Sequence, residues 1–238
     1  HRAHASLVPL ARLLPAYAGL HLAEEVVALE RVLERPQRPL VAVFGGVKME
    51  TKLSLIRRFL GDADRVIVGG AIANTLFALQ GGSVGRSMVD TAGAADISFL
   101  RDAKLFLPFD VVAVDRLAPG AAAAVRARGE VKADEYIADI GPKSREVFSG
   151  LLRGAKTVVW NGPMGYAEAP EFAEGTIAVA RAIQKTGAFT IVGGGDTVAA
   201  LRRHDVLAGF SHVSTGGGAM LEFLSGKKLP GLEVFRKQ

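Results

Sequence analysis

The sequence of 238 residues contains no cysteine, and aromatic residues make up only 7% of it. The absence of cysteine excludes disulfide bonds, thiolate chemistry and zinc sites built on thiolates, and it fits a reducing compartment. No apolar run reaches the ~20 residues that a membrane-spanning helix needs. We therefore expect a cytoplasmic protein that makes no contact with a membrane.

The chain also lacks an initiator methionine and the signal-peptide succession of basic, apolar and small-residue regions. It opens on His1-Arg2-Ala3-His4-Ala5-Ser6. From this opening we expect that the sequence has been cut out of something longer.

Charge of one sign is not concentrated anywhere, although the formal net charge is +5. The basic pairs at 57–58, 202–203 and 227–228 are isolated and lack the interleaved aromatic residues of single-strand binders. We therefore expect no nucleic-acid partner. Some of the positive charge can instead face an anionic small substrate.

Short apolar runs alternate with segments at helical spacing over most of the chain. The runs are continuous, as in strands buried on both faces, and they predict strands at 40–44, 65–69, 110–114, 157–160 and 190–192, with a weaker one at 210–213. The helical spacing predicts helices at 51–60, 72–79, 144–152, 172–186, 198–203 and 219–224. Such alternation implies right-handed βαβ units. We predict a Rossmann-like three-layer α/β/α fold with a mostly parallel sheet of about six strands.

Two segments stand outside this alternation. A helical pattern at 17–35 ends at Pro36, and it fits either an ordinary surface helix or a connector between two domains, which we favour. Residues 115–135 are low in complexity and fit either an excursion of the chain or a small antiparallel ribbon at the sheet edge. We find no chemistry in residues 115–135.

Glycine clusters directly after the predicted strands. Five strand ends carry a glycine-rich turn, at 45–46, 69–70, 162–165, 193–195 and 216–218. Ligands of open α/β sheets bind outside the carboxyl ends of the strands. Five such turns at one edge predict a ligand that lies against bare backbone, as a nucleotide with its polyphosphate would.

Two common nucleotide-binding motifs are absent. No Gly-x-x-x-x-Gly-Lys-[Ser/Thr] occurs, and the nearest candidate, at 150–157, has Ala155 between glycine and lysine. No Gly-x-Gly-x-x-Gly follows the first strand. A P-loop protein is therefore excluded, and a dinucleotide-dependent dehydrogenase is disfavoured.

Charged residues follow two of the glycine turns. Asp196 and Thr197 suit a helix N-cap, and they also suit a Mg²⁺ ligand and a phosphate contact. The stretch taken alone favours the cap. Lys48 and Lys52 are four residues apart after another glycine turn, where their ammonium groups can neutralise phosphate oxygens. Set among the other turns, Asp196 becomes the expected metal ligand, and it can still cap its helix.

Several longer motifs resemble those of phosphoglycerate kinases. They are Val159-Trp-Asn-Gly-Pro-Met-Gly165, Gly193-Gly-Gly-Asp-Thr197, Ser214-Thr-Gly-Gly-Gly-Ala219, Gly45-Gly-Val-Lys-Met-Glu-Thr-Lys52, Asp139-Ile-Gly-Pro-Lys-Ser144 and the opening six residues. The resemblance runs in order over essentially the whole chain. It implies a two-domain glycolytic kinase that transfers a phosphoryl group between 1,3-bisphosphoglycerate and ADP, giving 3-phosphoglycerate and ATP with Mg²⁺.

In that family the C-terminal half holds the nucleotide and the N-terminal half holds the phosphoglycerate. The resemblance therefore implies a remnant of the N-terminal domain at 1–16, an interdomain helix at 17–36, a nucleotide-binding domain at 37–225 and a C-terminal tail at 226–238. The missing N-terminal domain would be an intramolecular partner. We expect a monomer.

The resemblance also implies roles for single residues. Asp196 would bind Mg²⁺ and Thr197 a phosphate group, whereas Lys52 would bind the nucleotide phosphates and Lys48 the phosphoryl group in transfer. Glu168 would accept hydrogen bonds from the ribose hydroxyls. The remaining nucleotide contacts would be Gly45, Gly46, Gly69, Gly70, Ala138, Asn161, Gly165, Gly194 and Gly195.

The transferring phosphate and the second substrate would meet a further set of groups. The catalytic backbone amides would be those of Gly194, Gly195 and Gly217, which act beside the two lysines. The phosphoglycerate contacts would be His1, Arg2, Gly216 and Gly217.

The chain departs from the family in two respects. The usual Gly-Gly-Ala-Lys-Val-Ser-Asp-Lys is here Gly-Gly-Val-Lys-Met-Glu-Thr-Lys, so both lysines are kept. Nearly all of the N-terminal domain is absent, with the catalytic arginine and most of the basic patch. Because phosphoryl transfer depends on positioning and charge neutralisation, we expect little or no turnover by the chain alone. The alternative is a non-catalytic nucleotide-binding or interaction module derived from the family.

Overall fold

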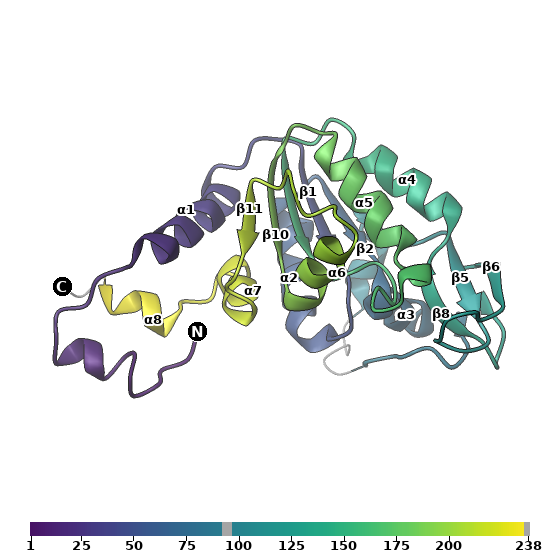
Figure 1. The fold of residues 1–238 in the computed structure, drawn as a ribbon, viewed down its shortest axis with the longest axis horizontal. Helices are drawn as coiled ribbons and strands as arrows, with labels where there is room; N and C mark the ends of the chain where they lie inside the picture. Colours follow the sequence, from purple (N-terminus) through teal and green to yellow (C-terminus); the bar gives the residue numbers. More distant parts are fainter. Residues whose placement is uncertain (92–96, 236–238) are drawn as a thin grey trace.

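The computed structural model describes residues 1–91 and 97–235. Its centre is a six-stranded sheet in the order β11-β10-β9-β1-β2-β4, in which all neighbouring strands run parallel (Figure 1). The strands are β1 (Leu40–Phe44), β2 (Arg65–Val68), β4 (Leu105–Phe106), β9 (Thr157–Asn161), β10 (Phe189–Gly193) and β11 (His212–Ser214). The prediction of a mostly parallel sheet of about six strands is confirmed.

Helices cover both faces of this sheet, because its strands are apolar on both. Along β1, Ala42 and Phe44 belong to one buried cluster and Val41 and Val43 to the other. The first cluster is completed by α1 (Leu20–Glu34), α2 (Met49–Asp62), α3 (Gly70–Leu79) and α7 (Gly218–Leu224). The second is completed by α4 (Pro142–Leu152), α5 (Glu174–Gln184) and α6 (Gly195–Arg203), which lie in front of the sheet in Figure 1. The fold is therefore a three-layer α/β/α sandwich, as predicted.

One strand was assigned to the wrong sheet. We expected residues 110–114 to continue the parallel sheet, but β5 (Asp110–Val114) pairs antiparallel with β6 (Ala123–Ala127) and β8 (Tyr136–Ile140). Burial along β5 is partial, as in a strand that packs on one face only. β6 confirms an antiparallel ribbon within 115–135, but it pairs with β5 in this separate sheet rather than at the edge of the main sheet. A further small sheet joins β3 (Ser83–Val84) to β7 (Glu130–Val131).

The other predicted elements are present with small shifts at their ends. The predicted helix at 172–186 is divided into η3 (Pro170–Phe172) and α5, and the predicted helix at 17–35 is α1. Two further short helices are η2 (Ser98–Arg101) and α8 (Pro230–Glu233). In the part of the chain that the structure describes, no helix has the length and apolar character needed to cross a bilayer.

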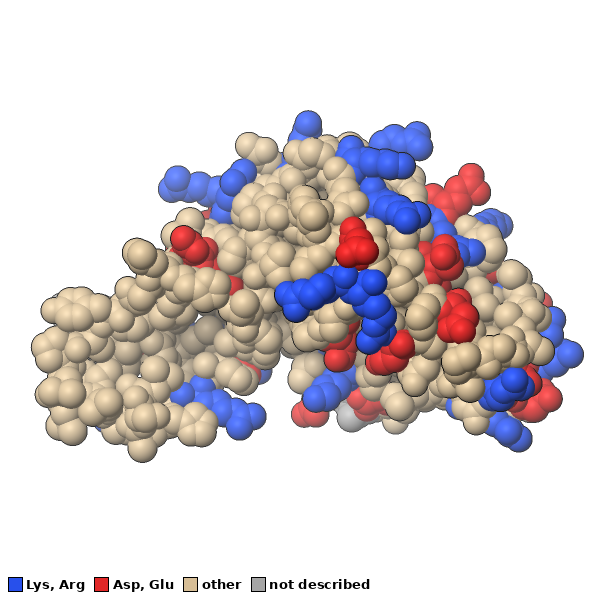
Figure 2. All heavy atoms as spheres, in the orientation of Figure 1, with Lys and Arg blue, Asp and Glu red and all other residues tan. Residues whose placement is uncertain are grey.

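The N-terminal segment and the C-terminal segment lie side by side and protrude from the body of the molecule (Figure 1). η1 (Leu10–Arg12) and α8 contribute to one groove there. Figure 2 shows that this protrusion is mostly uncharged on the face drawn, whereas Lys, Arg, Asp and Glu are interspersed over the body. Its surface exposes large apolar side chains, among them Leu13, Leu14, Tyr17 and Leu20. Residues 236–238 of the predicted tail lie outside the described residues.

Candidate functional site

The glycine turns meet along one edge of the sheet. They follow β11, β10, β9, β1 and β2, which are five consecutive neighbours in the strand order. Backbone hydrogen bonds join the turns: Gly46 N–H donates to the Pro163 carbonyl and Gly70 N–H to the Met164 carbonyl, both at 2.9 Å. The expectation of a single continuous rim is therefore confirmed.

Two of the turns pack so closely that only glycine fits. A Cβ at Gly45 would lie within 3.0 Å of the carbonyl oxygens of Gly162 and Pro163. Gly162 also has a φ of +100°, and a Cβ there would meet the backbone of Gly45. Part of the glycine content therefore serves packing between the turns rather than contact with a ligand. The N–H groups of Gly45 and Gly46 donate to protein carbonyls.

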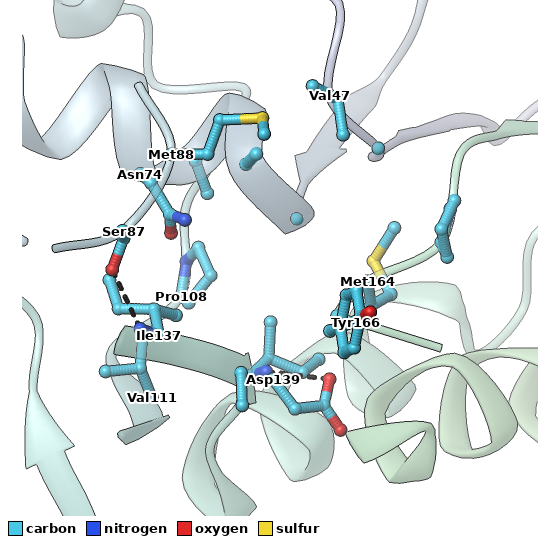
Figure 3. Close-up of a pocket in the computed structure, with 18 of the residues that line it drawn as sticks. Val47, Asn74, Ser87, Met88, Pro108, Val111, Ile137, Asp139, Met164 and Tyr166 are labelled. Atoms are coloured by element: carbon cyan, nitrogen blue, oxygen red, sulfur yellow. Dashed lines mark hydrogen bonds between the residues drawn. The ribbon is translucent and has the colours of Figure 1, made fainter. Parts of the chain in front are cut away.

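A cavity of about 280 Å³ opens between this rim and the small sheet of β5 and β8 (Figure 3). Six of the predicted nucleotide contacts line it: Gly46, Gly70, Ala138, Gly165, Glu168 and Asp196. Most of the remaining wall is apolar, and it includes Val47, Phe77, Met88, Pro108, Val111, Leu117, Ile137 and Met164. A cavity with an apolar interior and a few polar groups suits a flat heterocycle with a charged substituent.

The N-terminus of α6 supplies the clearest anion site at the rim. The backbone N–H groups of Gly195, Asp196 and Thr197 have no hydrogen-bond acceptor among residues 1–91 and 97–235. They lie at the positive end of the helix dipole, where an anion is favoured. The helix begins at Gly195 and its N-cap residue is Gly194. Capping of this helix by Asp196 is thus wrong, because Asp196 already lies within the first turn.

Lys52 reaches the same region from the buried face of α2. Its ammonium group donates to the Gly45 carbonyl, and only 7% of the residue is exposed. Burial lowers the pKa of Lys52 to about 8; the nearby Asp196 carboxylate opposes this shift and the Lys48 ammonium adds to it. The three side chains are therefore close enough to interact electrostatically. Lys48 itself is exposed, at the N-cap position of α2.

Other residues predicted to contact the nucleotide instead make hydrogen bonds or packing contacts between the turns of the rim. Asn161 is buried, and its side-chain amide donates to the Gly193 carbonyl at 2.9 Å. The Thr197 hydroxyl accepts the N–H of Gly162 at 2.7 Å. At Gly69 a Cβ would lie within 3.0 Å of the Met164 sulfur, so this turn packs against the residues after β9.

The predicted phosphoglycerate contacts lie outside the cavity wall, and two of them belong to the glycine turn after β11, at the end of the rim and before α7. Gly216 and Gly217 precede this helix, and Gly217 is its N-cap residue with a φ of +54°. The His1 imidazole lies 2.9 Å from the Glu222 carboxylate of α7. Arg2 is exposed to solvent. These residues are not part of the cavity wall.

Several residues of the wall could not be read from the sequence. Asp139 is 2% exposed and still borders the cavity, where Figure 3 shows it beside Tyr166 and Met164. Leu117 reaches the cavity from the segment in which we found no chemistry. The one available signal was the motif Asp139-Ile-Gly-Pro-Lys-Ser144, which carried part of the family resemblance but no assigned role for Asp139.

The donor set fits Mg²⁺ only together with a ligand. Within the described ranges, no three His, Cys, Asp or Glu side chains gather as a metal site would require. Mg²⁺ commonly takes one or two protein carboxylates and completes its shell with phosphate oxygens and water. The Asp196 side chain is exposed at the rim and receives no hydrogen bond from a described residue. One free carboxylate beside free backbone amides therefore suits a magnesium–phosphate complex.

Comparison with known proteins gives a consistent result. The family model described as phosphoglycerate kinase matches residues 1–227. The phosphoglycerate kinase of Thermus thermophilus is 49% identical over 98% of this chain, and that of Herpetosiphon aurantiacus is 44% identical over 98%. The chain spans 62% and 60% of the length of these two relatives.

Solved structures agree with the sequence relatives. Phosphoglycerate kinase from Coxiella burnetii superposes with a TM-score of 0.90 at 44% identity, over 98% of this chain and 62% of that one. The enzyme from Pyrococcus horikoshii gives a TM-score of 0.84 at 30% identity, over 99% and 61%. Fold, rim and family model agree, and the chain belongs to the phosphoglycerate kinase family.

Proposed function

We propose that this chain supplies the ADP/ATP site of a phosphoglycerate kinase. One observation carries the proposal: three features follow one another along the rim. They are an apolar cavity, the free backbone amides of α6, and the charged groups of Lys52 and Asp196. That succession has the same order as base, ribose and phosphates in a nucleotide. The base would lie in the apolar cavity and Glu168 would accept hydrogen bonds from the ribose hydroxyls.

The phosphates would then extend toward the first turn of α6. Lys52 has three N–H donors, of which one is used by the Gly45 carbonyl, so two can reach phosphate oxygens. The backbone amides of Gly194 and Gly195 and the hydroxyl of Thr197 would add neutral donors. Asn161, Gly45 and Gly69 would contribute by holding the turns in place.

Asp196 would hold Mg²⁺ together with the phosphate oxygens. When bound, the ion supplies positive charge that neutralises the developing charge on the phosphates. The Asp196 carboxylate would then orient the nucleotide through the metal ion, and the Lys52 ammonium would orient it through the phosphate oxygens.

In the proposed reaction, a β-phosphate oxygen of ADP bonds to the phosphorus of the acyl phosphate. The bond from that phosphorus to the carboxyl oxygen breaks, and 3-phosphoglycerate leaves as a carboxylate. No proton is transferred, so the chain needs no general acid or base; it needs alignment and positive charge. Lys48 and the amides before α7 would face the phosphoryl group in transfer.

We propose further that the chain alone does not turn over. Phosphoglycerate would be held mainly by groups outside these 238 residues, with only His1, Arg2, Gly216 and Gly217 contributed from within. The protrusion fits the expected remnant of the second domain at 1–16, with α1 as the interdomain helix. The body at 37–225 would act as the nucleotide-binding domain of a cytoplasmic monomer.

Calorimetry with MgADP tests the nucleotide site. Asp196→Asn should weaken MgADP binding about tenfold or more, since a hydrogen bond or contact with a charged group contributes about 1.5–3 kcal/mol. Asp205→Asn is the matched control, because Asp205 is exposed just beyond the other end of α6, outside the cavity wall. Equal affinities for all three proteins would contradict the assignment of Asp196.

A further inference from the structure

Asp139 is a buried carboxylic acid with no part in the phosphoryl transfer proposed above. Its two oxygens accept backbone N–H groups, from Ile140 at 2.8 Å and from Gly175 at 2.6 Å. Ile140 follows it on β8, whereas Gly175 lies in the first turn of α5. The carboxylate therefore ties the small sheet to the start of a helix on the main sheet.

The same helix start holds the cavity wall. The hydroxyl of Thr176, next to Gly175, accepts the N–H of Met164 at 3.0 Å. Met164 in turn accepts the N–H of Gly70 through its carbonyl, at 2.9 Å. A chain of contacts thus runs from Asp139 through the first turn of α5 to two turns that border the cavity.

A second contact from Asp139 is direct. A Cβ at Gly165 would lie within 3.0 Å of an Asp139 carboxylate oxygen, and the next residue, Tyr166, donates its N–H to the Ala138 carbonyl at 2.7 Å. Gly165 and Ala138 both line the cavity. Displacement of the carboxylate would therefore move the wall on which the base would lie.

We infer that Asp139 is a positioning residue whose ionised carboxylate fixes the Gly165 turn, so that protonation of Asp139 weakens nucleotide binding. The inference rests on the proposed nucleotide site. A carboxylate accepts at both oxygens, whereas the protonated acid carries a hydrogen on one of them. That hydrogen would face the N–H of either Ile140 or Gly175, and one of the two anchors would be lost.

The surroundings of Asp139 place the protonation of its carboxylate near neutral pH. Burial raises the pKa of Asp139 to about 7, against the opposing effects of the Gly175 and Ile140 N–H groups and of Arg145; Glu174 adds to the rise. Arg145 on α4 and Glu174 on α5 lie 3.6 Å apart. Glu168, on the turn after β9, borders the same cavity and is exposed. No histidine is present among the described residues that form the wall.

The test is the MgADP affinity of the wild-type chain and of Asp139→Asn between pH 6 and pH 8. An amide accepts at one position only, so Asp139→Asn resembles the protonated state at every pH. We expect the wild-type chain to bind about fivefold more tightly than Asp139→Asn at pH 8, for one lost hydrogen bond, and equally at pH 6. Titration of the nucleotide phosphate is common to both proteins and cancels in the ratio. A ratio that is constant with pH would overturn the inference.

Two charge variants at the Arg145–Glu174 ion pair should move the midpoint of the transition, and neither residue lines the cavity. Glu174→Gln removes a negative charge and should shift the midpoint of the affinity change to lower pH. Arg145→Gln removes a positive charge and should shift it to higher pH. Midpoints that stay unchanged in both variants would contradict a role for the ionisation of Asp139.

Amide NMR of the free chain separates failure of this inference from failure of the proposed function. In the absence of nucleotide, the N–H resonances of Gly165 and Gly175 should titrate together near pH 7 in the wild type and stay constant in Asp139→Asn. If the chain binds no MgADP but these resonances titrate, the nucleotide site is wrong and the positioning role stands. If they do not titrate, the positioning role is wrong whatever the chain binds.

Discussion

Burial changes the pKa of two side chains in opposite directions, one at the rim and one in the cavity wall. It lowers the pKa of Lys52 from 10.5 to about 8 and raises the pKa of Asp139 from 3.8 to about 7. Each group is thereby brought close to the point where it changes charge at neutral pH. A buried charge is costly to the fold, and proteins commonly keep such groups where binding requires them.

The lowered pKa of Lys52 predicts that the affinity for MgADP changes at alkaline pH. A lysine with a pKa of about 8 is charged below that pH and loses its charge above it, whereas a free lysine stays charged to pH 10.5. MgADP affinity should therefore fall above pH 8, by up to about tenfold per pH unit if only the charged form binds. Binding near pH 8 should also take up protons, which calorimetry detects as a heat that depends on the ionisation enthalpy of the buffer.

Two methionine variants make this prediction specific. Lys52→Met should bind MgADP weakly and without the alkaline decline. Lys156→Met is the control, because Lys156 is exposed before β9, at the opposite end of the strands. Proton uptake that persists in Lys52→Met would show that another group is responsible.

At the scale of elements, the site is built where strands end and helices begin. The turns after neighbouring strands share hydrogen bonds, and α5 and α6 direct their first turns toward them. Such close contacts require glycine at some positions, whereas at other positions a larger residue would fit. Two helical glycines differ in this respect: Gly175 packs against Asp139, whereas a Cβ at Gly150 would meet nothing within 4 Å.

Alanine at these two positions should therefore have opposite effects on stability. Gly150→Ala removes the backbone flexibility of a glycine within α4 and should stabilise the chain by about 0.5–1 kcal/mol. Gly175→Ala places a methyl group within 3.0 Å of side-chain atoms of Asp139 and Ile140 and should destabilise it by about 1–3 kcal/mol. Urea unfolding followed by circular dichroism measures both, and destabilisation of equal size in the two variants would contradict the packing described.

The elements most accessible to sequence reasoning were those with a strong local pattern. β1 and β9 are buried along their whole length, so their uninterrupted apolar runs marked them as strands of a covered parallel sheet. Residues 110–114 carry a similar run, and only tertiary pairing decides that they form the central strand of a separate antiparallel sheet. β4 has two residues, too few for any periodicity.

The site likewise has parts that could be predicted from local sequence and parts that could not. Glycine turns and flanking charges such as Asp196 are local, and the rim they form could be predicted once the strands were ordered. The apolar wall could not, because Met88 and Leu117 come from loops whose path depends on the small sheet. The start of α6 was placed too late, since no capping side chain marks a helix whose N-cap residue is Gly194.

At the scale of the whole molecule, the chain spans 62% of the length of its relative from Thermus thermophilus. The protrusion exposes apolar residues that a folded partner segment could cover, such as Leu13 at 80% exposure. Nucleotide binding and phosphoryl transfer are therefore expected to be separable properties.

A coupled assay can separate them. We expect the chain alone to show no phosphoryl transfer between ATP and 3-phosphoglycerate, although it binds MgADP. Addition of the N-terminal part of the Thermus thermophilus relative, as a separate polypeptide, should restore measurable transfer. The same addition to the Asp196→Asn variant should restore far less, and efficient turnover by the chain alone would contradict the division proposed.

The central claim is that the nucleotide lies along the rim, with its phosphates at the start of α6. Titration of the isotope-labelled chain with MgADP, followed by amide NMR, tests it most directly. The largest shifts should occur at Gly46, Gly70, Gly165, Gly195 and Thr197. Shifts confined to residues remote from the rim, such as those of α4, would contradict the account.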